Sequence, residues 1–489
     1  MWHTPGDSYR QATTISALPD NVLLEIFCFY KEKAENRLNY LGNRLVWKWH
    51  LLVHVCRGWR QVAFGSRICL DLRILCTPRT PARKDLGIWP SLPIVIDTRH
   101  NGGPYHGNLP SSSEDNMVAA LEHSERVCKI WIVTSGLWSE KIVTAMQGTF
   151  PLLTVLRILS ESGNGPVLPA EFLAPRLQSI MLRGIPFPAL PTLLLSTGDL
   201  VTLHLDDIPL SGYISPEAMV AGLAALPRLK DFTIRFQWDA PRPNRIPPPP
   251  ITRTLLPALT QFKFRGTSEY LEDLVSRIDA PQLNKISTYY LNQLADIPVT
   301  QLRMFVDRSV GPRSTQLRNA VLTFYDNLVS FRTYDRTNDP LGGHVTTWTA
   351  IRCQGFDWQT AHIAQVLSHL SASLSNAVHL NFEDRLDDSD PELESTDDVE
   401  WPHFLHQFST AQTLHIPHKL AGYVALALEN IASETVAEVL PSLDLIHLAG
   451  QSALSIEKFI AARRLSGRPV TVISTREEFD KRVESYNRK

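Results

Sequence analysis

The feature that most constrains the fold is a recurring phrase, Pro-x-apolar-x-x-apolar-x-apolar. It begins at positions 151, 175, 199, 227, 257 and 281, with Asp199 in the proline place of the third copy, and it returns at Pro441. The successive copies from 151 to 281 start 24, 24, 28, 30 and 24 residues apart. The alternating apolar residues predict a short strand with one buried face. A proline before it ends a preceding helix and favours extended backbone.

The segments between these phrases have helix signals. Ser215 is placed as an N-cap, with Pro216 at the first helical position and Glu217 behind it. Similar segments are SEYLEDLVSRI from Ser268, SEKIVTAM and SIEKFIAARRLSG. A period in the twenties with this strand phrase is typical of leucine-rich repeats, whose units bury a core only by stacking. We therefore expect an α/β fold: a curved, leucine-rich-repeat-like solenoid with a parallel concave sheet over residues 69–475.

Weaker copies and two insertions complete this repeat region. Further strands are predicted at VCKIWIV, QLRMFV, LVSFRTY, NAVHLNF and AQTLHI, with a last strand at PVTVIS. Residues 240–250 are proline-rich and predict a loop between repeats, or alternatively an SH3-type ligand. Residues 383–400 carry ten acidic residues and one arginine, which predicts a flexible acidic loop or alternatively a protein-docking segment.

Two apolar stripes precede the repeats. In ISALPDNVLLEIFCFY, the residues Val22, Leu23, Ile26, Phe27 and Tyr30 fall on one face of a short helix. A second helical stripe, broken near Gly58, consists of Leu45, Trp49, Leu52, Cys56, Trp59 and Ala63. A helical piece of about fifty residues supplies only a marginal core, so this one needs a neighbour.

The run LPDNVLLEIF followed by LLVHVCRGWRQVA resembles an F-box, and the first hundred residues resemble the F-box proteins of mushroom-forming fungi. The resemblance implies that residues 15–68 are a three-helix F-box that binds the Skp-type adaptor of a cullin–RING ubiquitin ligase. Residues 1–14 are then a flexible N-terminus and 476–489 a C-terminal tail. Ten residues match the motif and divide between the module's own core and the adaptor groove: Leu18, Pro19, Val22, Leu23, Ile26, Phe27, Leu52, Val55, Cys56 and Trp59. Exposed Val22, Leu23 and Phe27 are the expected sign of that docking.

Composition excludes several classes of partner. The net charge of −2 provides no global basic field for nucleic acid or an anionic membrane. No apolar run reaches the roughly 18 residues of a membrane span, and the N-terminus lacks the apolar region of a signal peptide. The six cysteines form no C-x-x-C pair and are too sparse for a disulfide framework, which favours a cytoplasmic or nuclear setting.

The chain has no sequence motif for nucleotide binding, metalloprotease chemistry or serine hydrolysis. His50 and His54, with Cys56 nearby, have a spacing that can hold a metal, but no fourth ligand accompanies them, and the same holds for His403 and His406. We expect no catalytic residue, no metal and no cofactor.

Residues between the apolar positions of the strand phrases point away from the core. Across the central repeats six of them are basic and two acidic: Arg157, Arg183, His204, Asp206, Asp231, Arg235, Lys263, Arg265, Lys285 and Tyr289. This surplus predicts that the concave face binds an acidic or phosphorylated segment of a target protein. The alternative is that a solvated strand face simply carries charge.

These patterns together predict the substrate-receptor subunit of a cullin–RING (SCF-type) ligase, which has no active site and acts by holding a target near the conjugating enzyme. The first alternative is a non-catalytic leucine-rich-repeat scaffold with a helical N-terminal cap and no ligase adaptor. The second is a hydrolase or transferase within residues 300–400, where the repeat is weakest.

Overall fold

The structure is a computed structural model of the 489-residue chain. It describes residues 18–29, 48–65, 72–75, 82–88, 93–98, 111–134, 136–160, 165–237, 252–291, 299–309, 317–335, 345–353, 356–369, 377–386, 401–429, 438–449 and 456–473. The predicted N-terminus 1–14, the proline-rich segment 240–250, most of the acidic segment and the tail 476–489 lie outside these ranges. The chain divides into two compact units, Met1–Phe187 and Pro188–Lys489.

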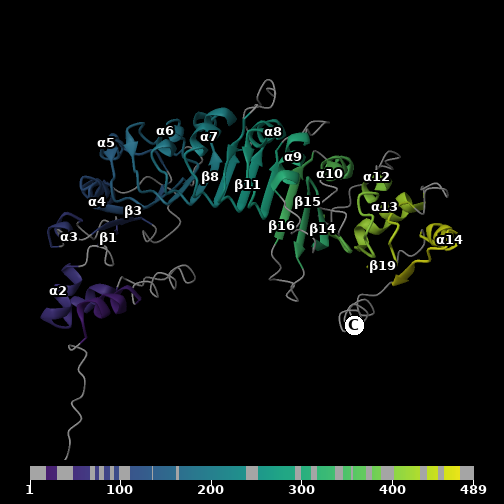
Figure 1. The fold of residues 1–489 in the computed structure, drawn as a ribbon, viewed down its shortest axis with the longest axis horizontal. Helices are drawn as coiled ribbons and strands as arrows, with labels where there is room; N and C mark the ends of the chain where they lie inside the picture. The colour runs from purple at the N-terminus through teal and green to yellow at the C-terminus, as the bar shows by residue number, and fades with distance from the viewer. Residues whose placement is uncertain are drawn as a thin grey trace, which may run out of the picture. The chain divides into compact units, whose positions relative to one another are not determined.

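Unit 1 begins with helical elements and continues as parallel α/β structure (Figure 1). The helical elements are a helix over residues 20–29, the 3-10 helix η2 (Lys48–His54) and α2 (Arg57–Gly65). Five parallel strands pair in the order β1 (Leu72–Leu75), β2 (Ile94–Asp97), β3 (Val127–Thr134), β5 (Val155–Ser160) and β7 (Ser179–Arg183). The connecting elements are α3 (Ala82–Ile88), α4 (Ser111–Leu121), α5 (Glu140–Ala145) and the short pair β4 (Gly148–Thr149) and β6 (Phe172–Leu173).

Unit 2 has a larger sheet that is mostly parallel and not closed. Its strands pair in the order β8 (Thr202–Ile208), β9 (Asp231–Phe236), β11 (Gln261–Gly266), β13 (Lys285–Tyr290), β16 (Val345–Arg352), β15 (Leu328–Asp335), β14 (Leu317–Tyr325), β17 (His379–Arg385), β18 (Thr413–Ile416), β19 (Leu445–Leu448) and β20 (Thr471–Ile473). The predicted α/β class with a parallel sheet is thus confirmed at this level.

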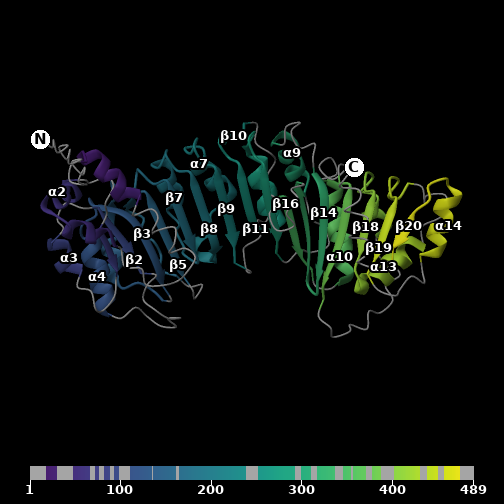
Figure 2. The same cartoon turned by 90° about the horizontal axis from the view of Figure 1, so that it is seen from below.

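The helices of unit 2 lie along one face of its sheet, and in Figure 2 the strands lie in front of them. They are α6 (Leu190–Leu195), η3 (Leu210–Gly212), α7 (Pro216–Leu223), α8 (Ser268–Ser276), α9 (Thr300–Ser309), α10 (Phe356–His369), α12 (Trp401–Leu405), α13 (His418–Glu429) and α14 (Glu457–Leu465). The pair β10 (Thr254–Leu255) and β12 (Ile278–Asp279) stands apart from the main sheet. Strand residues alternate between buried and half-buried, as in β11, because one face packs on the helices and the other is open.

The recurring proline is the second residue of a tight turn that leads into the strand after it. Pro175 is the second residue of a turn in which Leu177 N–H donates to the Ala174 carbonyl at 3.2 Å. The same bond recurs before β9, β11, β13 and β19, and the leucine that closes each turn is buried. Proline suits this position because its ring sets φ near the value that the turn requires. In the third copy Gly198, and not Asp199, occupies the place of the proline, because Leu200 bonds to Thr197.

The strand expected at QLRMFV is wrong, since these residues form part of α9. Leu302, Phe305, Val306 and Ser309 are its buried residues, and they recur at helical spacing. The other five predicted strands lie in β3, β15, β17, β18 and β20.

The expectation of an entirely parallel sheet also fails in one region. β14 and β15 form an antiparallel hairpin with a two-residue loop, Asp326 and Asn327, and β15 pairs antiparallel with β16. On either side of this region the pairing is parallel again, since β16 pairs with β13 and β14 pairs with β17. A hairpin of this kind needs only a short loop, whereas parallel neighbours need a crossover.

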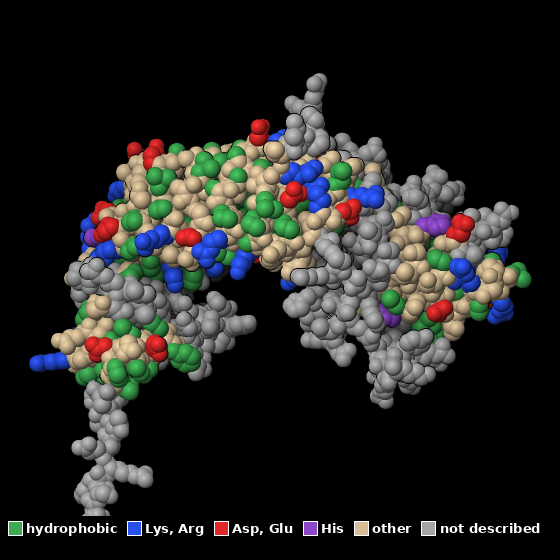
Figure 3. Space-filling view, in the orientation of Figure 1, with side chains coloured by type: hydrophobic (Ala, Val, Ile, Leu, Met, Phe, Trp, Pro, Cys, Tyr) green, Lys and Arg blue, Asp and Glu red, His purple; other side chains and the backbone are tan. Residues whose placement is uncertain are grey.

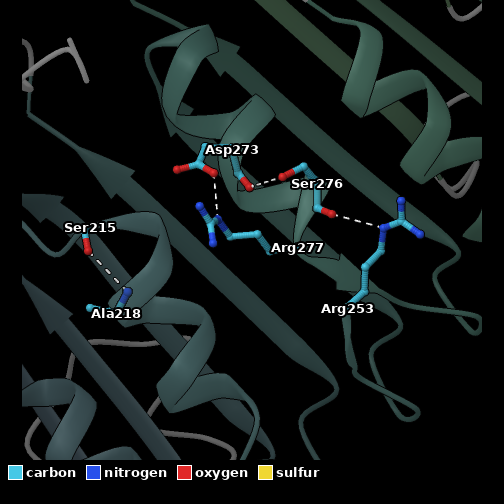
Figure 4. Close-up of polar contacts among 6 residues, drawn as sticks. All are labelled: Ser215, Ala218, Arg253, Asp273, Ser276 and Arg277. Carbon is cyan, nitrogen blue, oxygen red and sulfur yellow. Dashed lines mark hydrogen bonds and ion pairs between the residues drawn. The ribbon is translucent and has the colours of Figure 1, made fainter. Parts of the chain in front are cut away.

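Local hydrogen bonds fix the helix ends of unit 2 (Figure 4). Ser215 Oγ accepts from Ala218 N–H at 3.2 Å, so the predicted N-cap of α7 is confirmed. At the end of α8, Arg277 Nε lies 2.7 Å from Asp273 Oδ1, and Arg253 Nε donates to the Ser276 carbonyl at 3.1 Å. Arg253 precedes β10, so this bond ties the helix end to the segment that leads into the same repeat.

A buried carboxylate joins two successive helices. Glu272 of α8 is 3% exposed, and its two oxygens accept from the backbone N–H groups of Gln301 and Leu302 at 2.7 and 2.8 Å. These donors belong to the first turn of α9, whose N–H groups have no partner within the helix. Burial raises the pKa of the Glu272 carboxyl, and the two backbone hydrogen bonds oppose that rise only in part.

Replacing Glu272 with Gln tests this contact. The raised pKa means that the folded chain binds this proton more tightly than the unfolded chain. Stability from the group is therefore full below the ordinary pKa of about 4.3 and is lost as pH rises through the folded value. Glu272→Gln should make the free energy of unfolding fall less steeply as the pH rises from about 4 through the raised folded-state pKa, as measured by urea unfolding.

Gln301→Ala is the matched control, since it leaves both backbone donors and the Glu272 carboxyl in place. This variant should keep the pH dependence of the wild-type chain. Equal pH slopes in the wild type and Glu272→Gln would contradict the assignment.

Candidate functional site

The helical part of unit 1 has a small core of its own. Phe27 of helix 20–29 packs against Trp59 of α2, with ring centroids 5.1 Å apart. Arg60 Nε donates to the Val53 carbonyl at 3.0 Å and so ties α2 to η2. The buried side chains are Leu23, Phe27, Val53, Trp59, Val62 and Ala63. The apolar stripes of both predicted helices therefore converge on one another.

The surface of this helical part is unusually apolar. Four of the fourteen large exposed hydrophobic side chains in the described chain lie here: Ile26, Phe29, Leu51 and Val55, with 41%, 67%, 52% and 57% exposure. Hydrophobic side chains are visible on this part at the lower left of Figure 3. Such side chains cost free energy in water, and gathered on so few residues they are typical of a surface that a partner covers.

The structure separates the ten motif residues into core and surface. Leu23, Phe27 and Trp59 are buried, so the expected exposure of Leu23 and Phe27 is wrong, because both fill the helical core. Leu18, Val22 and Leu52 are half-buried. Pro19, Ile26, Val55 and Cys56 are exposed and available to a partner. Hydrophobic spacing alone could not make this separation, since both sets lie on the same helices.

The register of the unit 2 sheet brings distant residues into rows across the strands, and the rows contain both half-buried and buried residues. One row follows the register from His204 to Thr233, Lys263, Ser287 and Trp348. It continues through Arg332, Val321, Asn381, His415 and His447. The register alone places these residues side by side, since about 240 residues of sequence separate the two ends of the row.

Contacts between polar side chains connect the first strands on the open face of this sheet. His204 Nε2 lies 3.1 Å from Asp231 Oδ2, and Arg235 Nη1 lies 3.4 Å from Asp206 Oδ1. β8 and β9 slip out of register after Leu205, and Asp207 has a positive φ of 50°. The slip places both Asp206 and Asp207 on the half-buried face, and Asp207 Oδ1 reaches Arg265 Nη1 at 3.6 Å. Aspartate tolerates this left-handed backbone better than most residues do.

Two aromatic rings continue the face beyond the ion pairs. The guanidinium of Arg265 lies 5.4 Å from the ring centroid of Tyr289, a cation–π distance. The Tyr289 ring is in turn 6.1 Å from that of Trp348, with an interplanar angle of 34°. Burial raises the pKa of the Tyr289 hydroxyl, while Arg265 and Arg352 act in the opposite direction. Tyr289 is therefore neutral at physiological pH.

All ten residues predicted for the concave face lie on main-sheet strands in positions that are not fully buried. Two belong to unit 1, where Arg157 lies over the Trp131 ring at 5.4 Å and Arg183 is exposed at the end of β7. The other eight lie together in unit 2, on β8, β9, β11 and β13. The excess of positive charge on this face is smaller than the sequence predicts. Asp206 pairs with Arg235, and Asp207, which was not among the predicted residues, pairs with Arg265.

A cysteine and a histidine meet within residues 300–400, the region of the alternative hydrolase or transferase prediction. Cys353 Sγ lies 3.9 Å from His362 Nδ1, and both side chains are buried. Burial raises the pKa of the Cys353 thiol to about 12. A nucleophilic cysteine needs a lowered pKa, so this pair has the character of packed core residues.

No protein-family model matches the chain, and a search of curated proteins finds no match. None of the helices in the described ranges combines the length and the hydropathy needed to cross a membrane. Within those same ranges no three His, Cys, Asp or Glu side chains are grouped to hold a metal ion.

Alkylation tests the thiol assignment. Iodoacetamide at pH 8 should modify Cys56, which is exposed, and leave Cys353 intact, because a thiol of pKa about 12 is only about 0.01% thiolate at that pH. Mass spectrometry of tryptic peptides measures both sites, and a denatured sample shows that each can react. Comparable rates at the two cysteines in the folded chain would contradict a buried, inert thiol.

Proposed function

We propose that this chain is the non-catalytic substrate-receptor subunit of a cullin–RING ubiquitin ligase. Its helical part would bind a Skp-type adaptor, its strand–turn–helix units would stack as a leucine-rich-repeat-like solenoid, and the open sheet face would bind a target protein. The observation that carries the proposal is the exposure of four large hydrophobic side chains, Ile26, Phe29, Leu51 and Val55, on helical elements that already bury a core of their own.

The motif residues support the adaptor role in a specific way. Leu23, Phe27 and Trp59 close the core, so the module does not need the exposed residues for its own packing. Ile26 and Val55 belong to the same motif and are 41% and 57% exposed. Exposed aliphatic side chains backed by a packed core are suited to fill a partner's apolar groove.

The open face of unit 2 supports the target-binding role. It presents charged, hydroxyl and aromatic side chains at fixed spacing on a rigid sheet, which is the arrangement that protein recognition requires. Such a receptor needs no catalytic group of its own, because holding a target beside the ubiquitin-charged enzyme supplies proximity.

The adaptor role predicts the effect of a double substitution. Ile26→Ala with Val55→Ala should weaken capture of a purified Skp-type adaptor at least ~10-fold, because both side chains would lose contact with the groove. Biolayer interferometry measures the affinity. Far-UV circular dichroism should be unchanged, since neither residue belongs to the helical core.

Leu137→Ala with Leu465→Ala is the matched control, since both leucines are exposed, at 75% and 90%, and lie outside the helical part. This control should bind the adaptor as the wild type does. The ligase proposal fails if the wild type captures no adaptor, or if the Ile26 and Val55 variant binds as tightly as the wild type. A scaffold without an adaptor would then be the better description.

A further inference from the structure

The open face of unit 2 has two lysines whose charge is not compensated. Four lysine and arginine residues lie on this face of β9, β11 and β13: Arg235, Lys263, Arg265 and Lys285. Asp206 and Asp207 pair with the two arginines, at 3.4 and 3.6 Å. In the described part of the chain neither Lys263 nor Lys285 has an ion-pair partner. On these three strands the lysines are therefore the positive charges offered to a ligand.

The positions of the lysines favour an extended ligand. Lys285 lies opposite Gln261, and Lys263 lies opposite Ser287, so the two lysines are on neighbouring strands and offset by two residues. With parallel strands about 4.8 Å apart and a rise of about 3.3 Å per residue, such diagonal positions are about 8 Å apart. Carboxylates on residues i and i+2 of an extended segment project from the same side, about 6.5–7 Å apart. Two acidic residues separated by one residue match this spacing.

The same geometry disfavours a phosphate group. Phosphate is bound best by the planar fork of arginine, which donates two parallel hydrogen bonds. Both arginines on these strands are held by aspartates, and Arg265 also lies over the Tyr289 ring. The side chains left for the ligand are lysines, which act as separate point charges.

An aromatic surface adjoins the lysines. Trp348 lies opposite Ser287 on the next strand, and its ring is 6.1 Å from Tyr289. Both rings are half-buried and on the open face, so part of their apolar area is available to a ligand. A bulky apolar side chain placed there would bury that area and gain contacts with both rings.

We propose that Lys263, Lys285, Ser287, Tyr289 and Trp348 form a lysine–aromatic patch that binds an extended acidic segment of the target. The segment has two acidic residues separated by one residue, and a bulky apolar residue two positions further along. This inference rests on the proposed target-binding role of the open face and specifies the chemistry of the target.

Fluorescence polarisation with the purified full chain tests the patch. The probe is a fluorescein-labelled peptide with the core Glu-Ala-Glu-Ala-Leu. Lys263→Gln with Lys285→Gln should weaken its binding at least ~10-fold, and so should exchanging both glutamates of the peptide for glutamine. Lys263→Arg with Lys285→Arg should retain binding, and added salt should weaken the wild-type complex. Trp348→Ala should abolish the difference between the leucine peptide and the same peptide with serine in that place.

Lys84→Gln with Lys141→Gln is the matched control, because both lysines are exposed on helices of unit 1. Its affinity for the peptide should equal that of the wild type. Equal affinity for the glutamate and glutamine peptides, or no measurable binding of either, would overturn the inference. A phosphoserine peptide that binds more than tenfold tighter, and loses that advantage in Arg235→Gln, would overturn it in favour of a phosphate ligand.

Adaptor capture is measured separately and makes the two failures distinguishable. A chain that captures the adaptor but ignores the acidic peptide contradicts the patch alone. A chain that binds the peptide but no adaptor contradicts the ligase role alone.

Discussion

The parallel backbone ladder is the interaction on which the rest of the structure depends. One backbone carbonyl just before a strand accepts hydrogen bonds from two N–H groups of the next repeat along the sheet. The Thr260 carbonyl accepts from Asn284 and Lys285 at 3.0 and 3.1 Å, and the carbonyls of Thr154, Val201, Lys230, Val378 and Gln412 do the same. Each strand is thus positioned by its predecessor, and the buried leucine of the next turn completes the contact. This ladder, more than any one helix, determines which side chains of neighbouring repeats lie beside one another.

A ladder of this kind turns sequence position into spatial rows. Residues at the same position in successive repeats become neighbours across the sheet, so their side chains can interact with one another. The register slip in β8 shows how sensitive these rows are, since one extra residue brings Asp207 beside Asp206 and within reach of Arg265. Without the slip, strict alternation would place only one of these two aspartates on the open face. The charge of the face therefore depends on a backbone irregularity of a single residue.

The sequence predicted the parts of this structure that depend on local pattern. The proline phrase predicted strands because their buried face alternates, and Ser215 identified the start of α7. The same rule of alternation failed at α9, where Leu302, Met304 and Val306 alternate as the buried residues of a strand would. The helix forms with Glu272, about thirty residues upstream, bound to its first turn, and no local pattern can reveal such a partner. The antiparallel hairpin was missed for a similar reason, since the direction of pairing is a property of the assembled sheet.

The sequence pattern grouped the candidate site residues, but it did not separate the buried ones from the exposed ones. The motif spacing identified Leu23, Ile26 and Phe27 together. In the structure Leu23 and Phe27 are buried, whereas Ile26, on the same short helix, is exposed. On the sheet face, alternation identified the outward side chains and missed the pairing that neutralises two of them. Both errors have the same source: a pattern along the chain shows the direction of a side chain, while its function depends on what the fold places beside it.

The compensated arginines change what this face can discriminate. A face with four unpaired positive charges would bind most acidic segments, since attraction of that kind depends weakly on geometry. With Arg235 and Arg265 held by aspartates, a ligand that approached them would have to displace an existing pair. The aspartates also repel carboxylates placed near them, which penalises a misaligned acidic segment. If this face binds an acidic segment as we propose, its selectivity would depend on the spacing of the two lysines and on the adjacent rings, and the ion pairs would act against misaligned ligands.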